Sequence, residues 1–176
     1  MEHTKLETTG SKRTDFIVCG TGHRPNKLGG YSPKIIAKTI ATAHIWLDCN
    51  RPVRVISGMA QGWDIALALA AIKLRIPLTC AIPFEGQQNP WPLEDRKRFD
   101  KVIFSADTVK VISPGPYAAW KMEVRNKWMV DNSDIILALY NGDFKGGTAN
   151  CIKYAKLKNR QIFNMWEYFT TLNDAY

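Results

Sequence analysis

The sequence of 176 residues lacks the long apolar segments that define membrane and secreted proteins. Its longest uninterrupted apolar run, Ile65–Ile72, is far shorter than the ~20 residues that a membrane-spanning helix needs. The polar segment 1–14 contains no apolar core of the kind found in a secretory signal peptide. We therefore expect a cytoplasmic protein without a membrane partner, in which residues 1–14 form a polar tail.

Paired cysteines, clustered histidines and an excess of acidic residues are also missing. The four cysteines occur without a C-x-x-C pair, and the three histidines are isolated. This spacing fits neither a metal site nor a disulfide framework, so we expect free thiols and no bound metal. The 24 basic and 16 acidic residues leave a net charge of +8, which favours anionic partners such as nucleotides or nucleic acid. A solvated basic surface would have the same composition.

What the sequence does contain is a regular alternation of short apolar runs and longer segments of helical spacing. The apolar runs predict strands at 16–19, 53–56, 78–82, 109–112, 135–140 and 161–165. The intervening segments predict helices at 33–49, 62–75, 93–105, 118–132 and 148–158. Continuous apolar strands separated by helices are typical of parallel βαβ units. We therefore expect one α/β domain over 15–176, a Rossmann-like, doubly wound, mainly parallel sheet with helices on both faces.

Glycine is concentrated where three of the predicted strands end. Because parallel strands end at one edge of a sheet, where such folds bind ligands, we expect these turns to form a single pocket. Glycine and a helix N-terminus both bring backbone N–H groups close to phosphate, although glycine also serves tight turns that bind nothing. Neither G-x-G-x-x-G nor the P-loop pattern is present. The predicted ligand-binding residues here are Gly20, Thr21, Gly22, His23, Arg24, Ser57, Gly58, Met59, Ala60, Gly62, Asp64, Gly146, Gly147 and Thr148.

The order of these and later motifs resembles the SLOG superfamily. The motifs that carry the likeness are Gly22–Pro25, Ser57–Ala60 with Gly62 and Asp64, Pro83–Gln87, Arg125–Asn126, Met129–Asp131, Ser133–Asp134 and Gly146–Thr148. They are most similar to the YpsA/YoqJ-like branch, with LOG phosphoribohydrolases and DprA as distant relatives. The resemblance spans roughly 16–165 and implies a Rossmann-like fold that binds a nucleotide or nucleotide-derived ligand above the strand ends, with no further cofactor required.

Residues outside these turns complete the predicted site. Arg125 matches the superfamily's ligand-facing arginine and precedes Asn126; a guanidinium can bind phosphate bidentately, but it can also form a structural ion pair. Phe84 and Trp91 flank a polar loop, which is the composition of a base-stacking lid with Gln87 at the base edge. Aromatic residues of this kind also serve to pack a loop onto its domain.

The sequence departs from the LOG enzymes at their catalytic glutamate. Counted from Gly147, that position falls on Cys151, whose thiol does not replace a carboxylate at neutral pH. We therefore expect ligand binding for sensing, sequestration or regulation. Two alternatives stay open: cleavage or transfer at a nucleotide N-glycosidic bond, with Glu85 or Glu123 as the catalytic carboxylate, and single-stranded DNA binding of the DprA type. Whether the chain forms a homo-oligomer also stays open.

Overall fold

Six parallel strands form the central layer of the computed structural model, which describes residues 15–172. The strands are β1 Ile17–Gly22, β2 Arg54–Ser57, β3 Leu78–Ile82, β4 Thr108–Val111, β5 Ile135–Leu139 and β6 Gln161–Asn164. Their order across the sheet is β4-β3-β2-β1-β5-β6. All five residues of β3 are buried, as expected for a strand that is covered on both faces. The predicted parallel α/β sheet is confirmed.

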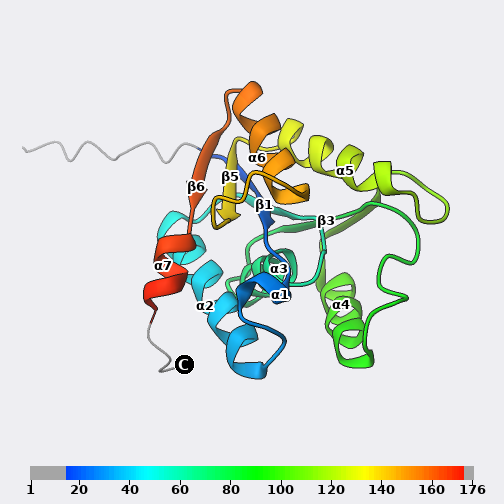
Figure 1. Cartoon of the computed structure of the whole chain (residues 1–176), viewed down its shortest axis with the longest axis horizontal. Helices are drawn as coiled ribbons and strands as arrows, with labels where there is room; N and C mark the ends of the chain where they lie inside the picture. The colour runs from blue at the N-terminus through cyan, green and yellow to red at the C-terminus, as the bar shows by residue number, and fades with distance from the viewer. Residues whose placement is uncertain (1–14, 173–176) are drawn as a thin grey trace, which may run out of the picture.

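Helices cover both faces of this sheet (Figure 1). They are α1 Pro25–Leu28, α2 Pro33–Asn50, α3 Trp63–Lys73, α4 Leu93–Ser105, α5 Ala119–Asp131, α6 Gly147–Leu157 and α7 Trp166–Thr171. Helices α5 and α6 lie on one face, and α2, α3, α4 and α7 lie on the other. The two short helices, α1 and α7, were not predicted because one or two turns carry too little periodicity to recognise.

The two faces of the sheet have cores of different size. Alternating residues of β1 point to opposite faces, so Val18 joins the larger core under α2, α3 and α4, and Cys19 joins the smaller core under α5 and α6. Trp63 and Leu67 of α3 are completely buried in the larger core. Helix α3 is therefore the best-buried helix, and its position determines where the turn before it lies.

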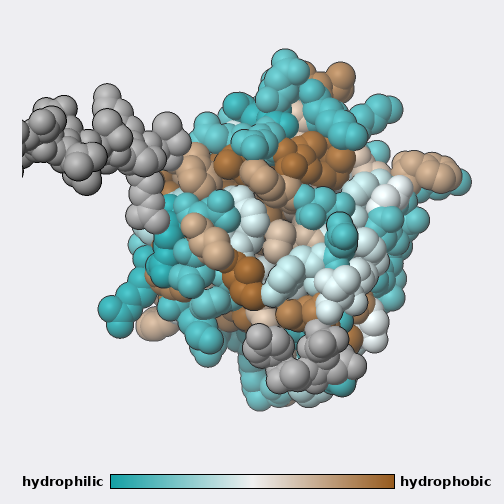
Figure 2. Space-filling model, turned by 90° about the vertical axis from the view of Figure 1, so that its left-hand side faces the viewer, coloured by the Kyte–Doolittle hydropathy of each residue, from teal (hydrophilic) through white to brown (hydrophobic). Residues whose placement is uncertain are grey.

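The side of the molecule formed by β6, α2 and α7 has a mixed surface. Hydrophobic residues occur there in small separate groups between hydrophilic ones (Figure 2). Within residues 15–172, no helix combines the length and the apolar composition that crossing a membrane requires.

The end of β1 differs from the prediction. Gly20, Thr21 and Gly22, expected to form a turn, continue the strand and pair with Leu137, Ala138 and Leu139 of β5. Glycine is needed in this part of the strand because α3 packs closely on it. A Cβ on Gly22 would lie 2.6 Å from the Trp63 side chain. The first turn of the site therefore begins at His23.

The order in which the chain adds strands to the sheet reverses at β1. Strands β2, β3 and β4 are added on one side of β1, and the chain then crosses to place β5 on its other side. In open α/β sheets, the crevice at the carboxyl ends of the two strands that flank such a reversal is where ligands bind. Because Gly22 is paired with Leu139, β1 and β5 end side by side and their following turns meet at this crevice.

Candidate functional site

A cavity of about 360 Å³ lies at the ends of β1 and β5, and we call it the switch cavity. Its size is within the ~300–1,000 Å³ range of small-molecule sites. Twelve of the predicted binding residues line it: Gly20, Thr21, Gly22, His23, Arg24, Ala60, Asp64, Arg125, Asn126, Gly146, Gly147 and Thr148. Segments more than one hundred residues apart in the sequence thus converge on one cavity.

The turn after β1 is fixed by its histidine. The backbone N–H of His23 donates to Leu139 O at 3.0 Å, and its Nε2 lies 2.7 Å from Asn141 Oδ1 in the turn after β5. The ring also packs edge-on against Trp166, with a centroid separation of 5.8 Å. Burial lowers the pKa of His23, so the imidazole is neutral at pH 7. His23 therefore joins the turns after β1 and β5, while its neighbour Arg24 is exposed at the rim.

The turn after β2 is held together by its own side chains. Ser57 Oγ donates to Asp64 O at 2.7 Å and accepts the Met59 N–H at 3.1 Å. Met59 has a φ of 60°, in the left-handed region that costs a non-glycine residue energy. Gly62, with a φ of 91°, leaves no room for a side chain because a Cβ would lie 2.6 Å from His23 O. Ser57, Gly58, Met59 and Gly62 therefore support the wall of the switch cavity without lining it.

Arg125 connects helix α5 to this turn from inside the protein. Its side chain is 3% exposed, Nη1 donates to Gly58 O, and Nε donates to Asn126 Oδ1 at 2.9 Å. A Cβ on Gly58 would collide with the guanidinium and lie 2.8 Å from Asp64 Oδ2, so a larger residue would displace these buried side chains. Arg125 thus has a structural role, and its other N–H groups are the ones that a ligand in the cavity could use.

Asp64 lies beside Arg125 and is also buried. Its Oδ2 accepts the Ala60 N–H at 3.3 Å, which holds the β2–α3 turn against the first turn of α3. Burial raises the pKa of Asp64, and the positive charge of Arg125 acts in the opposite direction. Burial lowers the pKa of Arg125, which still remains charged at neutral pH. The positive charge of Arg125 therefore offsets part of the cost of burying the Asp64 carboxylate.

The start of α6 is the open part of the cavity. No side chain among residues 15–172 caps this helix, and its first turn contains no acidic residue. Gly146 has a φ of 101°, and a Cβ added to Gly146 or to Gly147 would meet no described atom within 4 Å. Thr148 Oγ1 donates to Gly22 O at 3.0 Å and so attaches this helix start to β1. Unpaired N–H groups with free space in front of them form an anion-binding arrangement.

The charges around the cavity are mainly positive. Arg24, Lys27, Arg125 and Lys145 line it, and Asp64 is the single acidic residue among the lining residues within 15–172. Lys27 forms an ion pair with Asp143, which partly neutralises that side of the rim. The remaining charge favours an anionic ligand over a neutral or cationic one.

Phe84, Gln87 and Trp91 do not line the switch cavity. Phe84 packs against Tyr117 at a centroid distance of 5.3 Å, and both polar side-chain atoms of Gln87 are buried without a hydrogen-bond partner in the described part of the chain. Trp91 packs against Phe99 at 5.6 Å. The aromatic residues therefore have the alternative role considered above, which is to pack the loop onto its domain.

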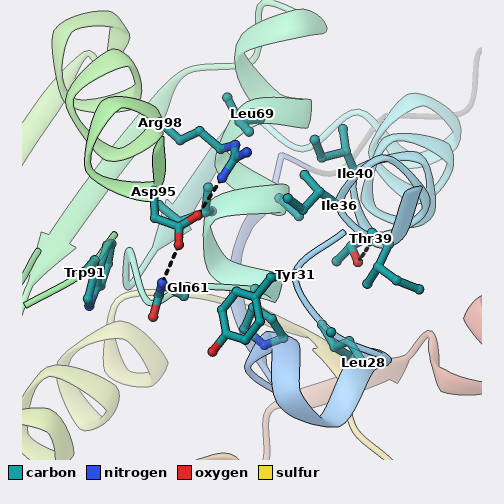
Figure 3. Close-up of a pocket in the computed structure, with 16 residues that line it drawn as sticks. Leu28, Tyr31, Ile36, Thr39, Ile40, Gln61, Leu69, Trp91, Asp95 and Arg98 are labelled. Carbon is teal, nitrogen blue, oxygen red and sulfur yellow. Dashed lines mark hydrogen bonds and ion pairs between the residues drawn. The ribbon is translucent and has the colours of Figure 1, made fainter. Parts of the chain in front are cut away.

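Trp91 instead lines a narrow apolar pocket of about 40 Å³ between α2, α3 and α4 (Figure 3). Tyr31, Ile36 and Leu69 form other parts of its wall. At its polar edge, Asp95 accepts hydrogen bonds from Gln61 Nε2 at 2.9 Å and from Arg98 Nη1 at 2.5 Å. The volume is enough for a few water molecules, so this pocket does not hold a nucleotide base.

The two candidate catalytic glutamates are also outside the switch cavity. Glu85 Oε2 accepts the Gly115 N–H at 3.0 Å, and Glu123 forms an ion pair with Lys127 at 2.8 Å. At the position of the LOG glutamate, Cys151 is buried, and burial raises the pKa of its thiol. All four cysteines are free, and residues 15–172 contain no group of three or more potential metal ligands.

Sequence reasoning missed five residues that line the cavity: Asn26, Lys27, Met122, Met129 and Lys145. Two signals could have identified some of them. Lys145 directly precedes Gly146, and Met122 and Met129 are spaced at i−3 and i+4 from Arg125, on the same side of a helix. Lys27 carries no such pattern, because its position depends on the four-residue helix α1.

Two known proteins are similar to this chain in sequence. The chain is 29% identical over 139 residues to the SPbeta prophage-derived protein YoqJ of Bacillus subtilis, covering 70% of this chain and 81% of YoqJ. It is 27% identical over 168 residues to a UPF0398 protein of Lysinibacillus sphaericus, covering 89% and 91% of the two chains.

Solved structures share the fold at low sequence identity. DNA processing protein A (DprA) of Streptococcus pneumoniae superposes with a TM-score of 0.62 at 18% identity over 86% of this chain, which spans half (50%) of the DprA chain. The molybdenum cofactor carrier protein of Chlamydomonas reinhardtii superposes with a TM-score of 0.55 at 11% identity, covering 90% and 85% of the two chains. A family model covers residues 18–172. The chain belongs to the YspA SLOG family (YpsA).

Proposed function

We propose that this protein binds a phosphate-bearing nucleotide or nucleotide-derived ligand in the switch cavity and acts in sensing, sequestration or regulation. The observation that carries the proposal is the start of α6, where Gly146 and Gly147 face open space at an uncapped helix N-terminus. The N–H groups of Gly147 and Thr148 are suited to hydrogen-bond phosphate oxygens, and Lys145 at the rim adds a positive charge.

Binding without turnover is supported by the state of the carboxylates. A glycosidic acid or nucleophile must reach the bond that breaks, and Asp64 is the only carboxylate that lines the switch cavity within residues 15–172. That carboxylate is buried, bonded to the Ala60 N–H and adjacent to Arg125. Its role is to hold the β2–α3 turn.

Single-stranded DNA binding is the second candidate, because proteins of the same fold include the single-stranded DNA-binding DprA of Helicobacter pylori beside the molybdenum cofactor carrier. DNA binding needs a continuous basic groove. Several basic residues of this chain are neutralised by ion pairs instead: Lys97 with Glu94, Arg98 with Asp95, and Lys158 with Asp131. This pattern favours a small ligand in the switch cavity over a DNA strand.

The test is isothermal titration calorimetry with three probes: inorganic phosphate, AMP and an oligo-dT strand. We expect AMP to bind, and Lys145→Ala to weaken that binding by about tenfold, the order expected for a lost charge-assisted contact. Lys156→Ala, at an exposed position of α6 away from the cavity, removes the same charge and is the control that should leave the affinity unchanged.

Two results would contradict the proposal. One is no detectable binding of phosphate or AMP at millimolar concentration. The other is an equal effect of Lys145→Ala and Lys156→Ala, which would mean that only the overall charge matters. Tight binding of oligo-dT with no binding of AMP would make the DNA-binding candidate the better account.

A further inference from the structure

A second cavity, of about 480 Å³, lies between α5 and α6, and we call it the α5–α6 cavity. It shares Met122, Asn126 and Gly147 with the switch cavity. The two spaces are therefore neighbours that meet at the first residue of α6. Each of the two cavities is by itself within the ~300–1,000 Å³ range of small-molecule sites. A mononucleotide bound in the switch cavity would therefore leave the α5–α6 cavity empty.

The α5–α6 cavity offers groups that recognise a heteroaromatic ring. Asn126 Oδ1 accepts from Arg125 Nε, while its amide nitrogen makes no hydrogen bond within residues 15–172. Asn150, exposed on α6 and lining the same cavity, has a carboxamide without a hydrogen-bond partner in that part of the chain. A carboxamide can pair with the donor and acceptor on a base edge. Met122 and Leu157 add apolar surface for the ring faces.

The charged groups of this cavity leave it weakly positive. Glu123, one of the two candidate catalytic glutamates, lines this cavity, where its carboxylate is held in an ion pair with Lys127 at 2.8 Å. Lys153 is a further cation on the wall. Tyr154 packs under Lys127, with 5.6 Å between Nζ and the ring centroid, and its hydroxyl donates to Asp131. The wall is thus polar and organised, which suits a nucleoside better than a lipid or an apolar peptide segment.

We propose that the ligand is of the dinucleotide class: two nucleosides joined through phosphates, with the phosphates near Gly147 and one nucleoside on each side of it. This inference rests on the proposed function, because it uses the same phosphate position, and it adds the chemical class of the ligand. Gly147 is the shared wall residue at which a Cβ would meet open space, so the linking phosphates can approach the backbone there.

The experiment compares the affinities of AMP and P1,P2-diadenosine diphosphate by calorimetry. We expect the dinucleotide to bind at least tenfold more tightly than AMP. Asn150→Trp places a bulky ring in the α5–α6 cavity and should remove this gain while leaving AMP affinity unchanged. Lys156→Trp, the same substitution on α6 away from both cavities, should retain the gain. Lys153→Trp is a second exposed position from which to fill the cavity, and it should act like Asn150→Trp.

Three outcomes would each overturn a different statement: the dinucleotide class of the ligand, the cavity that holds the second nucleoside, or the proposed function itself. Equal affinity for AMP and the dinucleotide in the unmodified protein would overturn the dinucleotide class and leave nucleotide binding intact. A gain that persists in Asn150→Trp and Lys153→Trp would place the second nucleoside elsewhere and overturn the assigned cavity. Absence of binding for both AMP and inorganic phosphate would reject the proposed function, and the inference with it.

Discussion

The glycines at the ends of β1 and β2 and those at the start of α6 look alike in the sequence, but they have different surroundings. A side chain on Gly20, Gly22, Gly58 or Gly62 would collide with other parts of the protein, chiefly Leu67, Trp63, Arg125 and His23 O. A Cβ on Gly146 or Gly147 would meet no described atom within 4 Å. The first set is required by packing, whereas packing requires nothing at Gly147.

This difference separates the glycines that build the cavity from those that leave it open. Gly146 has a positive φ that favours glycine, but Gly147 has neither a positive φ nor a close neighbour among the described residues. Substitutions in the first set should therefore affect stability, and substitution of Gly147 should affect ligand binding. Four variants or conditions should distinguish the two kinds of glycine and the side chains around them.

The largest effect is expected at Arg125, which contacts Gly58, one of the four glycines without room for a side chain. Arg125→Ala should lower the free energy of unfolding by about 3–5 kcal/mol, because it leaves the buried Asp64 charge and the Gly58 carbonyl without their partner. Urea denaturation measures this loss. Adding Asp64→Asn should restore part of the stability, since no carboxylate then remains to be compensated. This role would be disproved if the free energy of unfolding of Arg125→Ala were within about 1 kcal/mol of the unmodified protein, since that is the ordinary effect of a point mutation.

Gly22→Ala should come next, with a loss of about 1–3 kcal/mol from overpacking against Trp63. The measurement is again the free energy of unfolding from chemical denaturation. The matched control is the same substitution at Gly147. If Gly22→Ala and Gly147→Ala were equally stable, the distinction between crowded and open glycines would fail.

Gly147→Ala should change the free energy of unfolding by no more than about 0.5 kcal/mol, because the new methyl group meets no other described part of the protein. In the bound complex, the same methyl group would lie where a phosphate approaches the backbone. We expect AMP affinity to fall by about tenfold, equivalent to ~1.4 kcal/mol. Calorimetry with unchanged AMP affinity would show that the ligand does not approach Gly147.

The smallest effect concerns the pH dependence of stability. Burial raises the pKa of Asp64 in the folded protein, so between its unfolded and folded pKa values the native state binds more protons than the unfolded state. The contribution of Asp64 to stability should therefore fall as pH rises through that window. Denaturation at a series of pH values from the unfolded pKa of Asp64 up to neutrality should show a shallower decline for Asp64→Asn than for the unmodified protein. Identical pH profiles would mean that Asp64 does not have a raised pKa.

Much of the fold follows from local patterns in the sequence. Each major helix and each strand was predicted to within a few residues, apart from the end of β1, because continuous apolar strands and helical spacing are local signals. Gly20 and Gly22 were assigned to a turn because glycine usually ends a strand. The contact that reverses this preference, the packing of Trp63 on β1, joins residues about forty positions apart and leaves no local signal.

The candidate site divides in the same way. The glycine-rich strand ends, the basic composition and the family resemblance are evident from the order of the residues. Three features depend on folding: Trp91 and Phe84 pack away from the switch cavity, Arg125 supports a turn from within, and Gly147 has free space before it where two cavities meet. The physical reason is that burial and free space are properties of surfaces brought together by folding, and the same glycine or arginine serves packing or binding according to what lies opposite it.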